Sequence, residues 1–186
     1  APPLAGAFAV LALGIGLTPG LGSETAWSEL ALLPTVGGFV LFALGRISAR
    51  GRDAAALLLA AAALLLTWFA PDLDPASRIF ALMVAALSFA VVLYAVGFAA
   101  ADRHADRFWL FLFLMEGSLL GLATARGLDD FHVFWELMTW TSYLLVVHER
   151  TEKALRAGLV YFLMCVAGAH VMHYGILLLH AQAGGD

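Results

Sequence analysis

Two glutamates lie deep inside apolar stretches of the sequence, where an ionisable side chain is costly. Glu136 is the ninth residue of a stretch that begins at Leu128, roughly 12 Å along a helix, and Glu116 lies at a similar depth in the preceding stretch. Because a charged side chain at the bilayer centre costs about 2.5–3.5 kcal/mol on insertion scales, we expect Glu136 to accept and release protons and Glu116 to be a secondary relay. The alternative is that each is a neutral, hydrogen-bonded packing residue. A GxxxG pattern at Gly117 and Gly121 favours this alternative more strongly for Glu116.

Polar and aromatic side chains accompany Glu136 at helical spacing. His132, Thr139, Trp140 and Tyr143 share one face of a helix with Glu136, since they lie three, four or seven residues from it. Such a stripe either lines a hydrated path or packs against the polar face of another helix. Desolvation increases the proton affinity of a carboxyl group and a nearby cation decreases it, so a carboxyl group between these influences can load and release a proton. His132 and Tyr143 are therefore additional site candidates.

Three histidines lie on one side of the last apolar stretch. His170, His173 and His180 fall within about 80° of one another at 100° per residue. Histidine changes charge near neutral pH and relays protons, so we interpret His170 and His173 as further relay candidates. Simple packing is an alternative for all three, and ligation of haem or a metal is another. In the haem hypothesis the chain is a b-type cytochrome membrane anchor, with His132 and His180 as iron ligands.

The composition indicates that a lipid bilayer surrounds these residues. Hydrophobic residues make up 62% of the 186 residues and charged residues 13%, against roughly 45–50% and 25% in soluble domains. Within a bilayer the backbone must satisfy its own hydrogen bonds, so helices are expected. The single cysteine, Cys165, excludes an internal disulfide and a cysteine-cluster metal site. The ten Lys and Arg residues form no basic stripe of the kind that binds nucleic acid.

Apolar blocks close to the roughly 17–25 residues that cross a bilayer core divide the sequence. We expect an all-α, polytopic transmembrane helix bundle of about seven spans. The expected spans are Leu4–Thr18, Glu29–Gly45, Ala54–Ala70, Ala76–Ala100, Phe108–Ala125, Leu128–Val147 and Ala157–Ala181. Asp74 is expected to cap the fourth span, with Pro75 at its first position. Trp27, Trp68 and Trp109 lie at span ends and are interpreted as interfacial anchors.

Basic residues predict the orientation, because short loops rich in Lys and Arg stay on the cytoplasmic side. Three loops that share one side carry eight of the ten basic residues: Arg46, Arg50, Arg52, Arg103, Arg107, Arg150, Lys153 and Arg156. Only Arg78 and Arg126 lie opposite. We therefore expect an integral membrane protein of a bacterial inner membrane, with its N-terminus in the cytoplasm.

Three stretches resemble, in order and spacing, the antiporter-like membrane subunits of respiratory complex I, Mrp-type cation/proton antiporters and membrane-bound hydrogenases related to formate hydrogenlyase. The most specific runs from Phe131 to Arg150, with Trp-Glu-Leu-Met at 135–138 and Ser-Tyr-Leu-Leu-Val at 142–146. Leu73–Phe80 is similar to the start of the family's third helix, and Arg156–Met164 to the start of its sixth. The charged loop at 149–156 is most similar to the hydrogenase branch.

The resemblance implies two parts and a site. Residues 1–70 carry N-terminal transmembrane helices that match only in hydropathy, and residues 72–186 carry a segment similar to the N-terminal half of an antiporter-like subunit. Glu136 corresponds to the family's glutamate on the fifth helix, which pairs with a lysine on the seventh and changes proton affinities along a hydrophilic axis. The chain is then a non-redox transport subunit that moves protons, or cations against protons, coupled to a redox or antiport partner and with no bound cofactor.

This sequence departs from the family pattern, and these departures indicate which partners to expect. The family's members continue for several more helices, whereas this sequence ends after the equivalent of the sixth. The missing helices and the lysine are therefore expected from other membrane subunits of a complex. Glu116 and the histidines of the last stretch are not expected from the family. An accessory or scaffold subunit that kept the fold and lost transport is the alternative, and unchanged pumping by Glu136→Gln would favour it.

Overall fold

Six helices joined by short connections form the part of the chain that the computed structural model describes, which is residues 29–71, 73–99, 102 and 104–183. The helices are α2 (Glu29–Gly45), α3 (Ala49–Phe69), α4 (Pro75–Ala99), α5 (Ala105–Thr124), α6 (Leu128–Val146) and α7 (Glu152–Gln182). Within these residues there is no strand, so the expected all-α fold is confirmed. The expected span Leu4–Thr18 and the expected anchor Trp27 lie outside the described residues.

The helix limits follow the expected apolar blocks, and polar caps extend some of them. α2 has the expected limits, α4 begins and ends one residue earlier than expected, and α6 ends one residue earlier. α3 and α7 each begin five residues earlier than expected, because Ser48 and Thr151 cap them by accepting a backbone N–H of the first turn at 3.1 Å. Asp74 caps α4 as expected, since its Oδ1 accepts two backbone N–H groups at 3.0 and 3.1 Å.

Four of these helices, α3, α4, α5 and α7, are long and apolar enough to cross a membrane. α2 is apolar but shorter. α6 is less apolar because it carries Asp129, Asp130 and Glu136 within 19 residues. The expected count of about seven spans is therefore approximate, with α2 and α6 as the least typical members.

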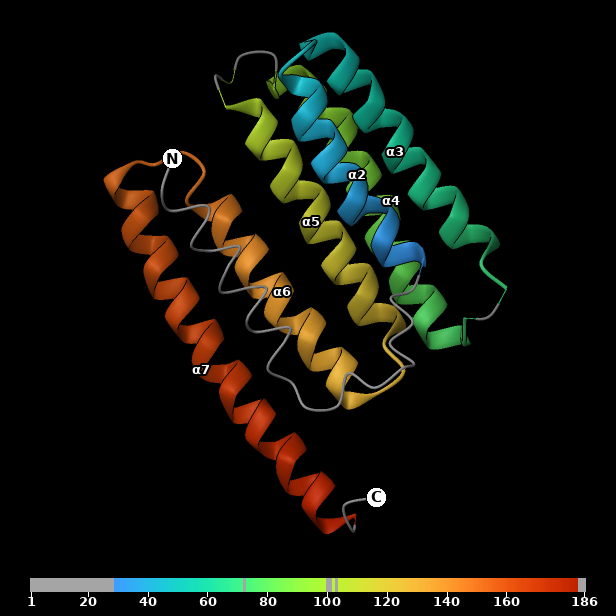
Figure 1. Cartoon of the computed structure of the whole chain (residues 1–186), viewed down its shortest axis with the longest axis vertical. Helices are drawn as coiled ribbons and strands as arrows, with labels where there is room; N and C mark the ends of the chain where they lie inside the picture. The colour runs from blue at the N-terminus through green and yellow to red at the C-terminus, as the bar shows by residue number, and fades with distance from the viewer. Residues whose placement is uncertain (1–28, 72, 100–101, 103, 184–186) are drawn as a thin grey trace.

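The helices divide into a four-helix unit and two helices added to one side of it. α2, α3, α4 and α5 each contact two others of the four, and α2 and α5 pack together although two helices separate them in sequence. α6 packs on α5, and α7 packs on α6 along the edge of the bundle (Figure 1). The core of the four-helix unit contains Leu41, Ala56, Ala60, Val92 and, from α5, Trp109 and Phe113. Among the described helices, α7 is thus the one that the other helices cover least.

The GxxxG glycines let α5 approach two different helices. A Cβ atom on Gly117 would contact Thr35 and the carbonyl oxygen of Ala31, both in α2. A Cβ atom on Gly121 would contact the ring of Phe134 in α6. Close packing at this pattern is confirmed, but α5 uses it to join the four-helix unit to α6 instead of pairing with a single helix.

Gly117→Ala is expected to lower the free energy of unfolding by about 1–3 kcal/mol, as overpacking does. The new methyl group would lie 2.8 Å from the carbonyl oxygen of Ala31 and would push α2 and α5 apart. Gly168→Ala in α7 is the matched control, because nothing lies within 4 Å of its Cβ position, and it should be neutral or stabilising by up to about 1 kcal/mol. Unfolding in detergent micelles measures both changes. Equal stability of the Gly117 variant and the wild type would contradict this packing.

Candidate functional site

The face of α6 that carries Glu136 is turned toward α7. α7 comes close at Gly158, where a Cβ atom would contact Val147 and lie 3.4 Å from the ring of Tyr143. The rings of Trp140 and Tyr143 pack against Phe162 of α7, with centroids 4.6 and 4.9 Å apart. Aromatic contacts therefore fill the end of this interface nearer the α6–α7 connection, and Tyr143 takes part in packing.

Glu136, His132 and His173 come together further along the same interface. His132 Nε2 lies 3.8 Å from Glu136 Oε1, and the rings of His132 and His173 stack with centroids 4.5 Å apart at 29°. The side chain of His132 is 10% exposed and that of Glu136 is 31% exposed, so the carboxyl group is the more accessible member. The structure thus brings three of the expected site residues into one cluster.

Two imidazole nitrogen atoms of this cluster make no hydrogen bond to the described residues. Nδ1 of His132 and Nδ1 of His173 are buried and have no hydrogen-bond partner within the described part of the chain. Each ring can therefore change its tautomer or take up a proton without first breaking an internal hydrogen bond. A carboxyl group beside one imidazole ring that stacks on a second has the chemical groups that a short proton relay requires.

The other histidines of α7 lie outside the cluster. His170 Nδ1 is 2.9 Å from the carbonyl oxygen of Val166, one turn earlier in the same helix, and its side chain is exposed. His180 Nε2 lies 3.6 Å from Asp129 Oδ2, and both side chains are more than half exposed. His132 and His180 face different partners, so their geometry does not favour the haem hypothesis.

Glu116 in α5 lies at the same depth as Glu136 in α6, but it is on the side of α5 that faces the four-helix unit. Eight residues separate Glu116 from the end of α5, and eight separate Glu136 from the start of α6. Glu116 is 1% exposed, and Trp109 and Phe113 on its face of α5 pack with α2, α3 and α4. The structure therefore does not bring the two acids together.

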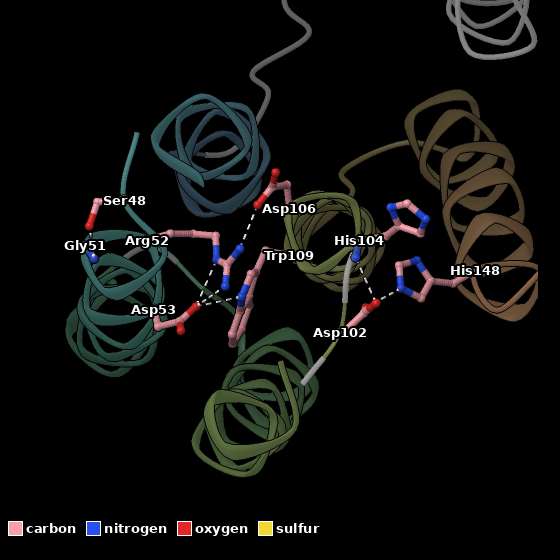
Figure 2. Close-up of polar contacts among 9 residues, drawn as sticks. All are labelled: Ser48, Gly51, Arg52, Asp53, Asp102, His104, Asp106, Trp109 and His148. Carbon is pink, nitrogen blue, oxygen red and sulfur yellow. Dashed lines mark hydrogen bonds and ion pairs between the residues drawn. The ribbon is translucent and has the colours of Figure 1, made fainter. Parts of the chain in front are cut away.

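A buried charge cluster at the starts of α3 and α5 was not anticipated from the sequence. Arg52 binds Asp53 through Nη2 at 2.8 Å and Asp106 through Nη1 at 2.6 Å. Asp53 Oδ1 also accepts a hydrogen bond from Nε1 of Trp109 at 3.1 Å (Figure 2). Gly45 at the end of α2 leaves room for Asp106, because a Cβ atom there would contact its carboxyl group. The cluster therefore joins the starts of α3 and α5 beside the end of α2.

Two expectations about this end of the bundle are wrong. Arg52 is not a loop residue, since it lies within α3 and is 4% exposed. Trp109 is not an interfacial anchor, because it is 0% exposed and packs in the core, whereas Trp68 is 63% exposed. One sequence feature could have indicated the buried charge cluster. An acid lies next to an arginine at 52–53 and at 106–107, close to the start of a long apolar helix in each case.

A second unanticipated pair joins two connections on the same side of the bundle. Asp102 Oδ2 lies 2.7 Å from His148 Nε2, and Asp102 Oδ1 accepts the backbone N–H of His104 at 2.8 Å (Figure 2). The His148 ring also packs edge-on against Phe108. Burial alone would raise the pKa of Asp102, but the hydrogen bonds from His104 and His148 hold this pKa below its ordinary value.

Asp102→Asn is expected to lower the free energy of unfolding by about 1 kcal/mol at neutral pH. A carboxyl group with a lowered pKa in the folded chain contributes stability above its unfolded pKa and loses that contribution as pH falls through the folded value. The wild type and the variant should therefore converge in acid. Denaturant unfolding in micelles at neutral and acidic pH measures the difference, with the exposed neighbour Glu149→Gln as the control. A difference that persists undiminished in acid would contradict the assignment.

A known family matches the C-terminal third of the chain. Residues 125–185 match the family model described as NADH:quinone oxidoreductase/Mrp antiporter, TM. This range includes α6 and α7 and so contains Glu136, His132 and His173.

Curated relatives align with a longer part of the chain. The Na(+)/H(+) antiporter subunit A1 of Staphylococcus haemolyticus is 30% identical over 112 residues, which are 60% of this chain and 14% of the relative. The putative antiporter subunit mnhA2 of Staphylococcus saprophyticus is 30% identical over 114 residues, with the same two coverages. The Na(+)/H(+) antiporter subunit A1 of Staphylococcus aureus (strain Newman) is 30% identical over 108 residues, 58% of this chain and 14% of the relative. The chain thus spans about one seventh of the length of these relatives.

Proposed function

We propose that this chain, an integral membrane protein with the transmembrane segment of the antiporter-like subunits, forms part of a proton pathway in an ion-translocating complex. Glu136 is the proton-accepting carboxyl group, and the imidazoles of His132 and His173 exchange protons with it. The observation that carries this proposal is the contact of the three side chains between α6 and α7, inside the segment that matches the family.

The proposed pathway requires a cation that approaches Glu136. The resemblance assigns this role to a lysine, and the one lysine of the sequence, Lys153, is exposed in the first turn of α7. α7 packs mainly against α6, and large apolar side chains along the rest of its surface are exposed. We therefore place further transmembrane helices against α7, in the same polypeptide or in other membrane subunits, with the lysine on one of them.

Charge movement then couples proton transfer to another process. An approaching cation favours the ionised form of Glu136, which releases its proton toward an imidazole, and withdrawal of the cation lets the carboxyl group reload. Because the relatives are named as Na(+)/H(+) antiporter subunits, we propose exchange of a cation for protons, with coupling to a redox partner as the second candidate. We assign the Arg52 end of the bundle and the N-terminus to the cytoplasmic side of a bacterial inner membrane.

His173→Gln tests the relay. In membrane vesicles that contain the assembled complex, we expect proton movement to fall by about 10²-fold, the lower end of the range for loss of a proton-transfer group. Glutamine keeps a polar side chain of similar reach but cannot take up and pass on a proton at neutral pH. A fluorescent dye that reports the pH difference across the membrane follows the rate.

His180→Gln is the matched control for this experiment. It removes an imidazole from the same helix, but His180 lies beside the exposed Asp129, so transport should stay at the wild-type rate. Equal losses in the two variants would mean that His173 acts only through the stability of α7. An unchanged rate in His173→Gln would contradict the relay.

A further inference from the structure

Glu116 is directed into an interior that the Glu136 cluster does not share. Trp109, Phe113, Glu116 and Leu120 follow one another at spacings of four, three and four residues, so they lie on one face of α5. All four are at most 1% exposed. Since Trp109 and Phe113 pack with α2, α3 and α4, this face looks into the four-helix unit.

The described residues around this face offer Glu116 no counter-charge. The side chains that α3 and α4 bury are mostly those of alanines: Ala56, Ala60, Ala63, Ala81, Ala85 and Ala95. Arg52 is also buried, but it already pairs with Asp53 and Asp106 beside Trp109, about 10 Å from Glu116 along α5. Both carboxyl oxygens of Glu116 lack a hydrogen-bond partner among the described residues.

An ionised carboxylate in such surroundings is strongly unfavourable, and a buried group without a partner takes up a proton instead. We propose that Glu116 carries a proton in the resting protein and forms a second protonation site, separate from the Glu136 cluster. This site goes beyond the proposed pathway and does not depend on it, because Glu116 faces α2, α3 and α4 while Glu136 faces α7.

α2 contains a backbone carbonyl group that lacks its usual helical donor. Pro34 lies inside α2 and has no N–H, so the carbonyl group of Leu30 lacks its usual helical donor. Pro34 and Leu41 are seven residues apart on one face of α2, and Leu41 packs with Trp109 and Phe113. A carboxylic acid can donate to such a carbonyl group and a carboxylate cannot.

Infrared spectroscopy of the full chain in lipid nanodiscs tests this proposal, because a protonated carboxyl group and a carboxylate have separate stretching bands. At neutral pH we expect a protonated-carboxyl component that shifts in D₂O and decreases in Glu116→Gln by the share of one carboxyl group. The component should persist in Glu136→Gln and in Glu152→Gln, whose side chain is 80% exposed. A wild-type spectrum without the component, or a Glu116→Gln spectrum that retains all of it, would overturn the proposal.

Reaction with a carbodiimide gives a second readout on the wild-type chain. The acid adds across one C=N bond of N,N′-dicyclohexylcarbodiimide: its proton goes to nitrogen and its oxygen bonds to the central carbon. The acyl group then moves from oxygen to nitrogen, and the product is a stable N-acylurea with no leaving group. Mass spectrometry should find this adduct on Glu116 in the wild type and in Glu136→Gln. An adduct on Glu116 from a water-soluble carbodiimide alone would show a hydrated group and contradict the proposal.

The two proposals can fail separately in these experiments. Transport that does not depend on Glu136, combined with an intact Glu116 component, would refute the pathway and leave the second protonation site standing. Transport that depends on Glu136, combined with a wild-type spectrum that lacks the Glu116 component, would refute the second protonation site and leave the pathway standing.

Discussion

Glu136→Gln is expected to reduce proton movement by the assembled complex by about 10³-fold, within the range for removal of a group that transfers a proton. The amide keeps the size of the side chain but cannot take up or release a proton at neutral pH. Because Glu136 is 31% exposed and contacts His132 at 3.8 Å, the change should leave the packing of α6 and α7 intact. Vesicle assays of proton movement, with complex assembly checked in mild detergent, measure the effect.

Glu152→Gln provides the matched control, since it removes the same charge from an exposed position at the start of α7. We expect wild-type transport from this variant. If Glu136→Gln also transported at the wild-type rate, the chain would be a scaffold that has kept the fold and lost transport. Loss of assembly in Glu136→Gln alone would mean that the residue acts in packing.

Arg52→Ala is expected to lower the free energy of unfolding by about 3–5 kcal/mol, because it leaves two acids without their cation in a largely buried site. The Arg52 side chain is 5% exposed, and Asp53 and Asp106 are 17% and 28% exposed. Denaturant unfolding in micelles measures this change.

Arg50→Ala is the matched control, because Arg50 is exposed in the same turn of α3 and should change stability by no more than about 0.5 kcal/mol. A triple variant with Arg52→Leu, Asp53→Asn and Asp106→Asn should recover part of the stability lost in Arg52→Ala, because no charge is then left unpaired. Equal effects of Arg50→Ala and Arg52→Ala on stability would contradict a stabilising role of the buried charge cluster.

The fold was largely predictable because the bilayer sets both the length and the composition of each helix. The apolar blocks located all six described helices, and Asp74 with Pro75 marked the start of α4. The early starts of α3 and α7 were missed because charged first turns project beyond the apolar block. The resemblance to antiporter-like membrane subunits, carried chiefly by residues 131–150, is confirmed by the family match at 125–185.

The candidate site was predictable only within single helices. Helical periodicity placed His132 and Glu136 on one face of α6, but it does not specify which neighbouring helix that face contacts. For this reason His173 could not be distinguished from His170 and His180, although only His173 stacks on His132. The same limit led to the expectation that Glu116 and Glu136 belong to one relay.

Contacts between distant segments account for the remaining differences. The pairing of Arg52 with Asp106 joins residues that are 54 positions apart, and the pairing of Asp102 with His148 joins residues 46 apart. Trp109 is a tryptophan near the end of an apolar block, as an interfacial anchor would be. However, Asp53 accepts a hydrogen bond from its indole N–H inside the bundle. Helix packing, which the linear pattern does not determine, decided each of these outcomes.

The contact between the Glu136 carboxyl group and the His132 imidazole is the most direct test of the proposed relay. In the full chain labelled with ¹³C at the glutamate carboxyl carbons, the resonance that disappears in Glu136→Gln identifies this group. We expect this resonance to move in His132→Gln, because the two groups lie 3.8 Å apart, and to keep its position in His180→Gln, because His180 lies beside Asp129 instead. A Glu136 resonance that keeps its wild-type position in His132→Gln would contradict a proton relay at Glu136.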